Sequence, residues 1–134
     1  MSNKTLFQKI IAGDLPGNIP YQDEKTAVII ALEGHPLVVP KEHYTDIFDL
    51  PDDVAAAIMQ TTVKVAKALK LVTNCDGINL VQSNGASAGQ EVFHFHMHVK
   101  PRFVGDDTSL NWNTETTSEK SRGELADKIK SVII

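Results

Sequence analysis

The sequence predicts a single α+β domain built on an antiparallel sheet, and two observations support this prediction. Segments of strand-like character and segments of helical period are interspersed along the chain, but they do not alternate in a regular strand-helix-strand repeat. The 134 residues, with 42% hydrophobic and 22% charged side chains, suffice for one core of ordinary size. We therefore expect one domain over residues 1–134, with a core over residues 1–115 and a C-terminal helix over residues 116–134.

A short helix is expected near the N-terminus, followed by two strands. In residues 4–12, Leu6, Ile10 and Ile11 fall on one side of a helix, and Gly13 follows where a helix would stop. Residues 24–32 and 37–39 are rich in β-branched and aliphatic side chains, which favour strands. The segment Gly34-His35-Pro36 joins them in a tight connection, so we expect His35 at the entrance of a strand.

The second half of the chain is predicted to contain a long helix, two strands and a final helix. From Pro51 onward, apolar residues recur at three- and four-residue steps, and proline suits the first turn of a helix. Residues 77–82 and 92–100 alternate in the manner of strands. Ser121 and Glu124 have the spacing of a capping box, which predicts the start of the last helix.

Charge and cysteine content exclude several function classes. A formal net charge of −4, without a stripe of Lys and Arg, argues against nucleic acid as a partner. Cys75 is the only cysteine, so no intrachain disulfide or thiolate cluster for zinc can form, and we expect it to be buried. No apolar run approaches the roughly 18 residues of a membrane span. We expect a cytoplasmic protein without a membrane partner.

Three of the five histidines stand at alternate positions, as His94, His96 and His98. Successive side chains of a strand point to opposite faces, so the three imidazoles would share one face, roughly 6.6–6.8 Å apart. The apolar residues that alternate with them, Phe93, Phe95, Met97 and Val99, would pack into the core. Histidine is not a favoured strand residue, so this grouping indicates a site rather than a merely polar face.

Two chemistries use such a row of histidines. Neutral imidazoles two residues apart on a strand can share a zinc ion if further ligands come from elsewhere. An imidazole can also attack phosphorus, since its ordinary pKa of about 6.5 leaves it largely neutral at pH 7. The loop over residues 83–90 has two glycines and small side chains, so we expect its backbone N–H groups to approach a phosphate. This loop favours the second chemistry.

The histidine segment resembles the signature of the histidine triad (HIT) superfamily, in which three histidines alternate with apolar residues. Here it reads His94-Phe95-His96-Met97-His98-Val99-Lys100, with Lys100 where the family prefers an apolar residue. Other segments that resemble the family are Phe7–Gly13, Gly34–Lys41, Ala88–Val92 and Leu110-Asn111-Trp112. The resemblance spans residues 5 to about 115.

The resemblance implies a fold and a mechanism. Each subunit would hold a five-stranded antiparallel sheet with helices, and two subunits would join into a ten-stranded sheet in a homodimer. His96 would attack the α-phosphorus of a nucleoside phosphoramidate, a dinucleoside polyphosphate or a related adenylate, and water would hydrolyse the nucleotidyl-histidine intermediate. His98 would contact the phosphate, and His94 with His35 would orient His96. The resemblance implies neither a cofactor nor a catalytic metal.

The resemblance also implies a set of residues near the nucleotide and its phosphate: Ser83, Asn84, Gly89, Gln90 and Glu91. Besides Lys100, three positions depart from the family pattern. Glu91 stands where many relatives have Ser or Thr, Ile30 lies near the place of an acidic residue that holds the ribose, and Ser83 replaces a frequent amide. Two alternatives therefore stay open: a nucleotide-binding module with little catalysis, and a metal-dependent hydrolase that uses the same histidines.

Some relatives bind a structural zinc through two N-terminal cysteines and histidines. This chain has Thr5 and Gln8 at the cysteine positions, so we predict no zinc there and expect His43 to be a surface residue. We expect Trp112 to serve core or dimer packing rather than ligand contact.

Overall fold

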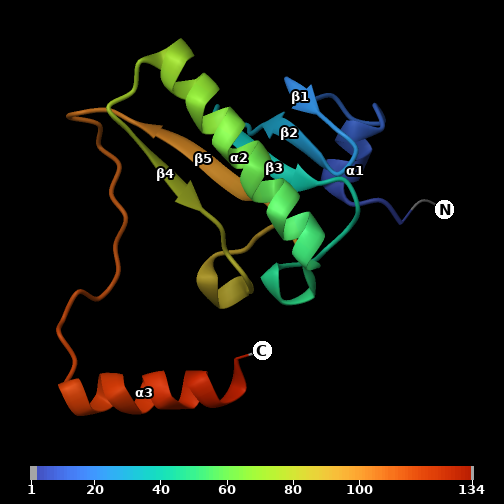
Figure 1. Cartoon of the computed structure of the whole chain (residues 1–134). Helices are drawn as coiled ribbons and strands as arrows, with labels where there is room; N and C mark the ends of the chain where they lie inside the picture. Colours follow the sequence, from blue (N-terminus) through green and yellow to red (C-terminus); the bar gives the residue numbers. More distant parts are fainter. Residues whose placement is uncertain (1–2, 134) are drawn as a thin grey trace.

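The computed structural model describes residues 3–133 and contains one five-stranded sheet and three α-helices (Figure 1). The strand order is β1-β2-β3-β5-β4, and every neighbouring pair is antiparallel. The strands are β1 (Tyr21–Gln22), β2 (Thr26–Ile30), β3 (Pro36–Pro40), β4 (Gly77–Val81) and β5 (Met97–Arg102). The helices are α1 (Leu6–Ile11), α2 (Asp52–Thr73) and α3 (Glu119–Val132), with short 3₁₀ helices η1 (Ile47–Asp49) and η2 (Ala86–Ala88). The predicted α+β class with a five-stranded antiparallel sheet is confirmed.

The sheet is covered on both faces, which explains why nearly every side chain of β2 and β3 is apolar. On one face, α2 lies across the strands and packs against the core residues Val28, Val38, Phe95 and Val99 (Figure 1). On the other face, Phe7 of α1 joins a second cluster of buried side chains, which are Ala27, Ile29, Leu37 and Val39. The α1 face is the one that carries the large cavity described below.

The ends of α2 follow from local chemistry. Pro51 is the N-cap, and the acidic residues Asp52 and Asp53 occupy the first turn, where the helix dipole favours negative charge. The helix ends at Asn74, which takes a left-handed conformation with φ of 52° and donates its N–H to the carbonyl of Lys70. Cys75 follows at once and is buried, as expected.

Two predicted boundaries are wrong. The last strand begins at Met97, not at residue 92, because the N–H of Phe95 donates to the carbonyl of Tyr44 instead of a neighbouring strand. The side chain of Phe93 is consequently 50% exposed instead of packed in the core. The cap of α3 is Ser118, whose hydroxyl accepts from the N–H of Ser121, so the helix starts one turn earlier than a capping box at Ser121 predicts.

The C-terminal segment extends away from the sheet (Figure 1). Every residue from 107 to 133 is exposed, including Trp112, which therefore does not pack in the core of this chain. Within residues 3–133, no helix combines the length and the hydropathy that crossing a membrane requires.

Candidate active site

A cavity of about 760 Å³ opens on the α1 face of the sheet. Apolar side chains of α1, β2 and β3 form its walls, and they include Phe7, Ile10 and Ile29. His96 and His98 lie on its wall together with the loop residues Gly89 and Glu91. The fold therefore brings two of the three triad histidines to one cavity, as expected, because β5 sends His98 to this face of the sheet while Val99 is buried on the other side.

The tautomer of His96 is set by the backbone. Its Nδ1 lies 2.7 Å from the carbonyl oxygen of His94. A carbonyl oxygen can only accept, so Nδ1 carries the proton and donates it. In the neutral ring Nε2 then holds a free lone pair, which is the form that a nitrogen nucleophile requires.

His98 is paired with His35, which comes from the entrance of β3. The Nε2 of His35 and the Nδ1 of His98 are 2.8 Å apart, so one ring donates to the other. Burial is the largest cause that lowers both pKa values, and it brings the pKa of His98 to about 4. Both rings are consequently neutral at pH 7, and each neutral ring has one N–H to donate. When His35 is the donor of this bond, the single N–H of His98 is on Nε2 and can donate to a phosphate oxygen.

His94 lies behind the cavity rather than in it, and it is fully buried. Its Nε2 donates to the carbonyl of Pro40 at 2.8 Å, so its Nδ1 accepts from the hydroxyl of Thr5 at 2.7 Å. Burial lowers the pKa of His94 to about 4, which keeps the ring neutral. The ring edge of Phe7 contacts both His94 and His96, with centroid separations of 5.4 and 5.3 Å. His94 therefore positions the backbone carbonyl on which the orientation of His96 depends.

All three imidazoles lie on the α1 side, as expected, since Phe7 contacts the rings of His94 and His96 and the latter contacts His98, but the three histidines do not share one strand. Only His98 stands in β5, whereas His94 and His96 precede the strand. The ring of His96 still lies 4.9 Å from that of His98, in an edge-on arrangement, while the ring of His94 turns inward between α1 and β3.

The surroundings of His94 do not fit a zinc ion. The hydroxyl of Thr5 already bonds to His94, and the amide of Gln8 donates to the carbonyl of Lys41 at 3.2 Å. His43 is exposed, as expected, and stacks on His94 at 5.5 Å while its Nε2 donates to the carbonyl of Phe93. Within residues 3–133, His, Cys, Asp and Glu form no group of three or more that could hold a metal ion. The lack of a structural zinc stays a prediction.

The glycine loop, residues 83–90, is held in shape by hydrogen bonds between its own backbone groups. Gly85 and Gly89 both have φ of 93°, a conformation that favours glycine. The N–H groups of Ala88, Gly89 and Gln90 donate to carbonyls of Gly85 and Ala86, so the loop is not the open N–H cradle that its composition suggests. The loop instead places Gly89 and Glu91 on the cavity wall.

Three predicted nucleotide contacts, at Ser83, Asn84 and Gln90, do not line the cavity. The buried side chain of Gln90 accepts from the N–H of Gly85 at 2.8 Å and donates to the carbonyl of Thr45 at 2.7 Å. Asn84 accepts from the N–H of Ile47 at 2.8 Å. Gln90 and Asn84 therefore hold the loop in shape.

Sequence reasoning missed several residues of the cavity. Phe7 has a signal in the apolar side of α1, but its contact with two histidines depends on tertiary packing. Asn18 and Glu33 line the cavity near Ile30, and neither belongs to a motif. The carbonyl of Asn18 accepts from the N–H of Ile30 at 3.0 Å, which fixes the backbone of Asn18 beside Ile30.

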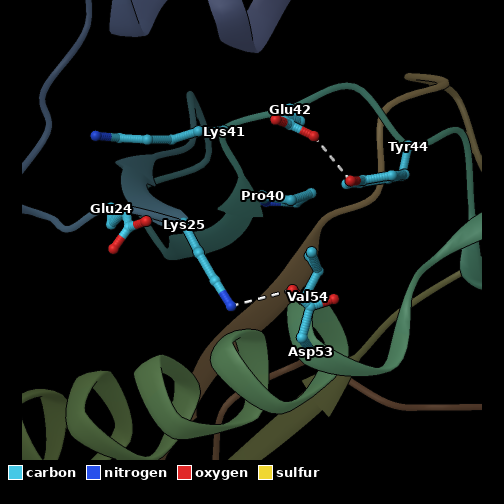
Figure 2. A pocket seen from close by; sticks show the side chains of 8 residues that line it. All are labelled: Glu24, Lys25, Pro40, Lys41, Glu42, Tyr44, Asp53 and Val54. Carbon is cyan, nitrogen blue, oxygen red and sulfur yellow. Dashed lines mark hydrogen bonds and ion pairs between the residues drawn. The ribbon is translucent and has the colours of Figure 1, made fainter.

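One of two smaller cavities, of about 200 Å³, lies on another part of the surface (Figure 2). Its charged groups are engaged with their neighbours: Lys25 pairs with Asp53 at 3.1 Å, and Tyr44 donates to Glu42 at 2.9 Å. Glu24 also lies at its edge. No histidine lines this cavity, so the reactive groups are concentrated in the larger one.

Comparison with known proteins gives concordant matches. A family model described as "HIT domain" matches residues 13–105. "Protein hit" of Bacillus subtilis is 36% identical over 120 residues, which are 86% of this chain and 83% of that protein. "Adenosine 5'-monophosphoramidase HNT1" of Candida albicans is 33% identical over 135 residues, covering 93% of this chain and 88% of that protein. The crystal structure of a HIT family protein from Bacillus anthracis superposes with a TM-score of 0.92 at 33% identity and covers all of both chains.

Proposed function

This chain belongs to the histidine triad family, and from that premise we propose that it hydrolyses a nucleotide at its α-phosphate with His96 as the nucleophile. The substrate class comprises nucleoside phosphoramidates, dinucleoside polyphosphates and related adenylates, in line with the phosphoramidase among its relatives. The observation that carries the proposal is the 2.7 Å hydrogen bond from Nδ1 of His96 to the carbonyl of His94. It leaves the lone pair of Nε2 free beside an open cavity.

The reaction has two steps. The Nε2 lone pair of His96 forms a bond to the α-phosphorus, and the bond to the leaving group breaks with its electron pair on that group. Water then attacks the same phosphorus, and His96 departs with the electron pair of the nitrogen–phosphorus bond. His98 donates a hydrogen bond to the phosphate oxygens in both steps. Its ring stays neutral at pH 7 and keeps the N–H that makes this bond.

Two residues without a catalytic role complete the proposed machinery. His35 bonds to His98 and fixes its ring, and His94 holds the carbonyl that sets the tautomer of His96. Asn18 is our candidate for the ribose hydroxyls, because it lines the cavity, its backbone is bonded to that of Ile30, and its side-chain amide can both donate and accept hydrogen bonds.

Replacing the nucleophile tests the proposal. His96→Ala should reduce turnover of adenosine 5′-phosphoramidate by several orders of magnitude, while circular dichroism remains native. The control His43→Ala removes an exposed histidine outside the cavity and should retain turnover. A near-native rate for His96→Ala would exclude His96 as the nucleophile.

The same assay separates the two alternatives. A nucleotide-binding module would bind AMP yet leave every phosphoramidate and dinucleotide intact, an outcome that the departures at Glu91 and Ile30 motivate. A metal-dependent hydrolase would lose its activity on exhaustive chelation, whereas hydrolysis through His96 should persist.

We also propose that the chain forms a homodimer in which α3 contacts the second copy. The apolar side of α3, formed by Leu125, Ile129 and Val132, is 48–74% exposed. A helix of 14 residues is marginal alone in water, so it needs a surface to pack against. The full-length match to the Bacillus anthracis structure indicates that the extended C-terminal arm is shared with a solved relative.

A second copy also suits the open edge of the sheet. Among the described residues, β4 has a strand neighbour on one side only, and Leu80 on it is 44% exposed. The double variant Leu125→Glu/Ile129→Glu should shift the mass from two chains to one in light scattering. An unchanged dimer would exclude α3 from the interface, and a monomeric wild type would exclude the dimer. We also propose that the protein resides in the reducing cytoplasm, because its single cysteine is buried and free of disulfides.

A further inference from the structure

The charged side chains that line the active-site cavity are acidic. Within residues 3–133, Glu33 and Glu91 line the cavity, and neither Lys nor Arg does. His98 adds no positive charge at pH 7, because its pKa is lowered to about 4. A site of this composition can hold a phosphate through hydrogen bonds, but it offers little compensation for several negative charges.

The two carboxylates line the same cavity as His96 and His98. Glu91 lies two residues after Gly89 on the wall that also holds His96 and His98. The negative charge of Glu33 raises the pKa of both His35 and His98 against the larger effect of burial, so it acts at the same end of the cavity. The opposing positive charge of Lys100 acts on both His35 and His98, with a larger effect than that of Glu33, but Lys100 does not line the cavity.

This charge distribution discriminates between leaving groups. A nucleoside polyphosphate departing from the α-phosphorus would place additional negative charges beside Glu91. An amine that carries a positive charge would meet a carboxylate of opposite sign. One facing pair of unit charges near a protein surface is enough to change a rate constant on the order of tenfold.

We propose that Glu91, assisted by Glu33, makes this site selective for nucleoside 5′-phosphoramidates whose amine portion carries a positive charge, over dinucleoside polyphosphates. This selectivity rests on the proposed hydrolysis through His96. The substrate enters with its phosphoramidate nitrogen protonated, the Nε2 lone pair of His96 bonds to phosphorus, and the P–N electron pair passes to the departing nitrogen. The amine leaves neutral and takes up the proton that is released when water later displaces His96. In both steps Glu91 attracts the separate cationic group at the far end of the amine chain, not the nitrogen bonded to phosphorus.

A matched set of substrates tests this selectivity. Three adenosine 5′-phosphoramidates share a four-carbon chain that ends in an ammonium, a methyl or a carboxylate group, and diadenosine tetraphosphate is the fourth substrate. We expect kcat/KM of the wild type to fall in that order, with the ammonium compound preferred over the carboxylate compound by at least about tenfold. The preference should weaken with added salt, since exposed charges are screened.

Charge-removing variants assign the preference to its residues. The ammonium-to-carboxylate ratio of kcat/KM should drop by about tenfold in Glu91→Gln and by a smaller factor in Glu33→Gln. It should stay unchanged in the control Glu24→Gln, whose carboxylate lies at the other cavity (Figure 2). The ratio is taken on one protein sample at a time, so a fraction of misfolded variant cancels.

The outcomes separate this selectivity from the proposed function. Equal rates for the three amines, a preferred tetraphosphate, or an unchanged ratio in Glu91→Gln would overturn the charge selectivity and leave the nucleophile in place. Turnover of none of the four substrates, or undiminished turnover by His96→Ala, would overturn the hydrolysis through His96 and the selectivity with it.

Discussion

Acidification should destabilise this protein in a way that can be traced to His94. The pKa of His94 is about 4 in the folded chain, against an ordinary value of 6.5, because burial of the ring disfavours its charged form. The unfolded chain therefore binds a proton more readily than the folded chain below pH 6.5. The stability that neutral His94 contributes is complete above that pH and is lost as the pH falls toward 4. At pH 5 the linked loss is about 2 kcal/mol.

Urea unfolding at pH 7.5, 6 and 5, at one protein concentration, measures this loss. His35 and His98 also have lowered pKa values and add to the wild-type slope, so a variant is needed to isolate His94. His94→Gln does not titrate, and its amide can still donate to the carbonyl of Pro40. It should be less stable than the wild type at pH 7.5 but lose about 2 kcal/mol less on going to pH 5.

His43→Gln is the matched control for the pH experiment. This exposed residue stacks on His94, but both hydrogen bonds of His94 remain when it is replaced. The control should retain most of the wild-type pH dependence. A His94→Gln variant with the full wild-type slope would refute the reasoning that His94 is held neutral by its surroundings.

Three further substitutions test the supports of the site. Thr5→Val removes both the hydroxyl that donates to His94 and the cap of α1, and should lower the free energy of unfolding by about 1–3 kcal/mol. Thr5→Ser keeps the hydroxyl and should retain most of this stability. Equal stability of Thr5→Val and the wild type would contradict the contact with His94. Gly89→Ala forces a side chain to φ of 93° and should cost about 1–2 kcal/mol, visible as a lower Tm; an unchanged Tm would show that the loop relaxes freely. Asn18→Ala should raise KM for an adenosine phosphoramidate but not for its 2′,3′-dideoxy analogue, and an equal rise for both would remove Asn18 from ribose binding.

Local chemistry made much of the fold predictable. The three- and four-residue spacing of apolar side chains gives α2, and Pro51 marks its start within one residue. The β-branched runs give β2 and β3, because both faces of these strands are buried and nearly every side chain is apolar. The two-residue strand β1 was missed, since so short a segment at a sheet edge has no periodicity to read.

The histidine segment shows where such reasoning fails. Alternation continues through His94 and His96, yet the backbone joins the sheet only at Met97. What redirects it lies far away in sequence: the carbonyl of Tyr44 takes the N–H of Phe95, and Thr5 with Pro40 takes the ring of His94. Contacts between residues so far apart in the sequence cannot be predicted from a local sequence pattern.

The part of the candidate site that the sequence predicted is the set of histidines, because their side-chain chemistry is recognisable without the tertiary structure. His35, His96 and His98 are brought together, and the neutral state of His98 follows from burial, which composition cannot show. Asn84 and Gln90 have side chains that could bind a nucleotide, but only the tertiary structure reveals that they are consumed in bracing the loop. The acidic lining at Glu33 was likewise invisible, because it depends on which loop reaches the cavity.

The most direct test of the account is to stop the reaction during turnover and find the covalent intermediate. With a phosphoramidate labelled in its adenosine portion, digestion and mass spectrometry should place one adenylyl group on the peptide that contains His96, on its Nε2. No adduct should form in His96→Ala. Label on another residue, or steady turnover with no labelled peptide under conditions that preserve phosphorus–nitrogen bonds, would contradict the assignment of His96 as the nucleophile.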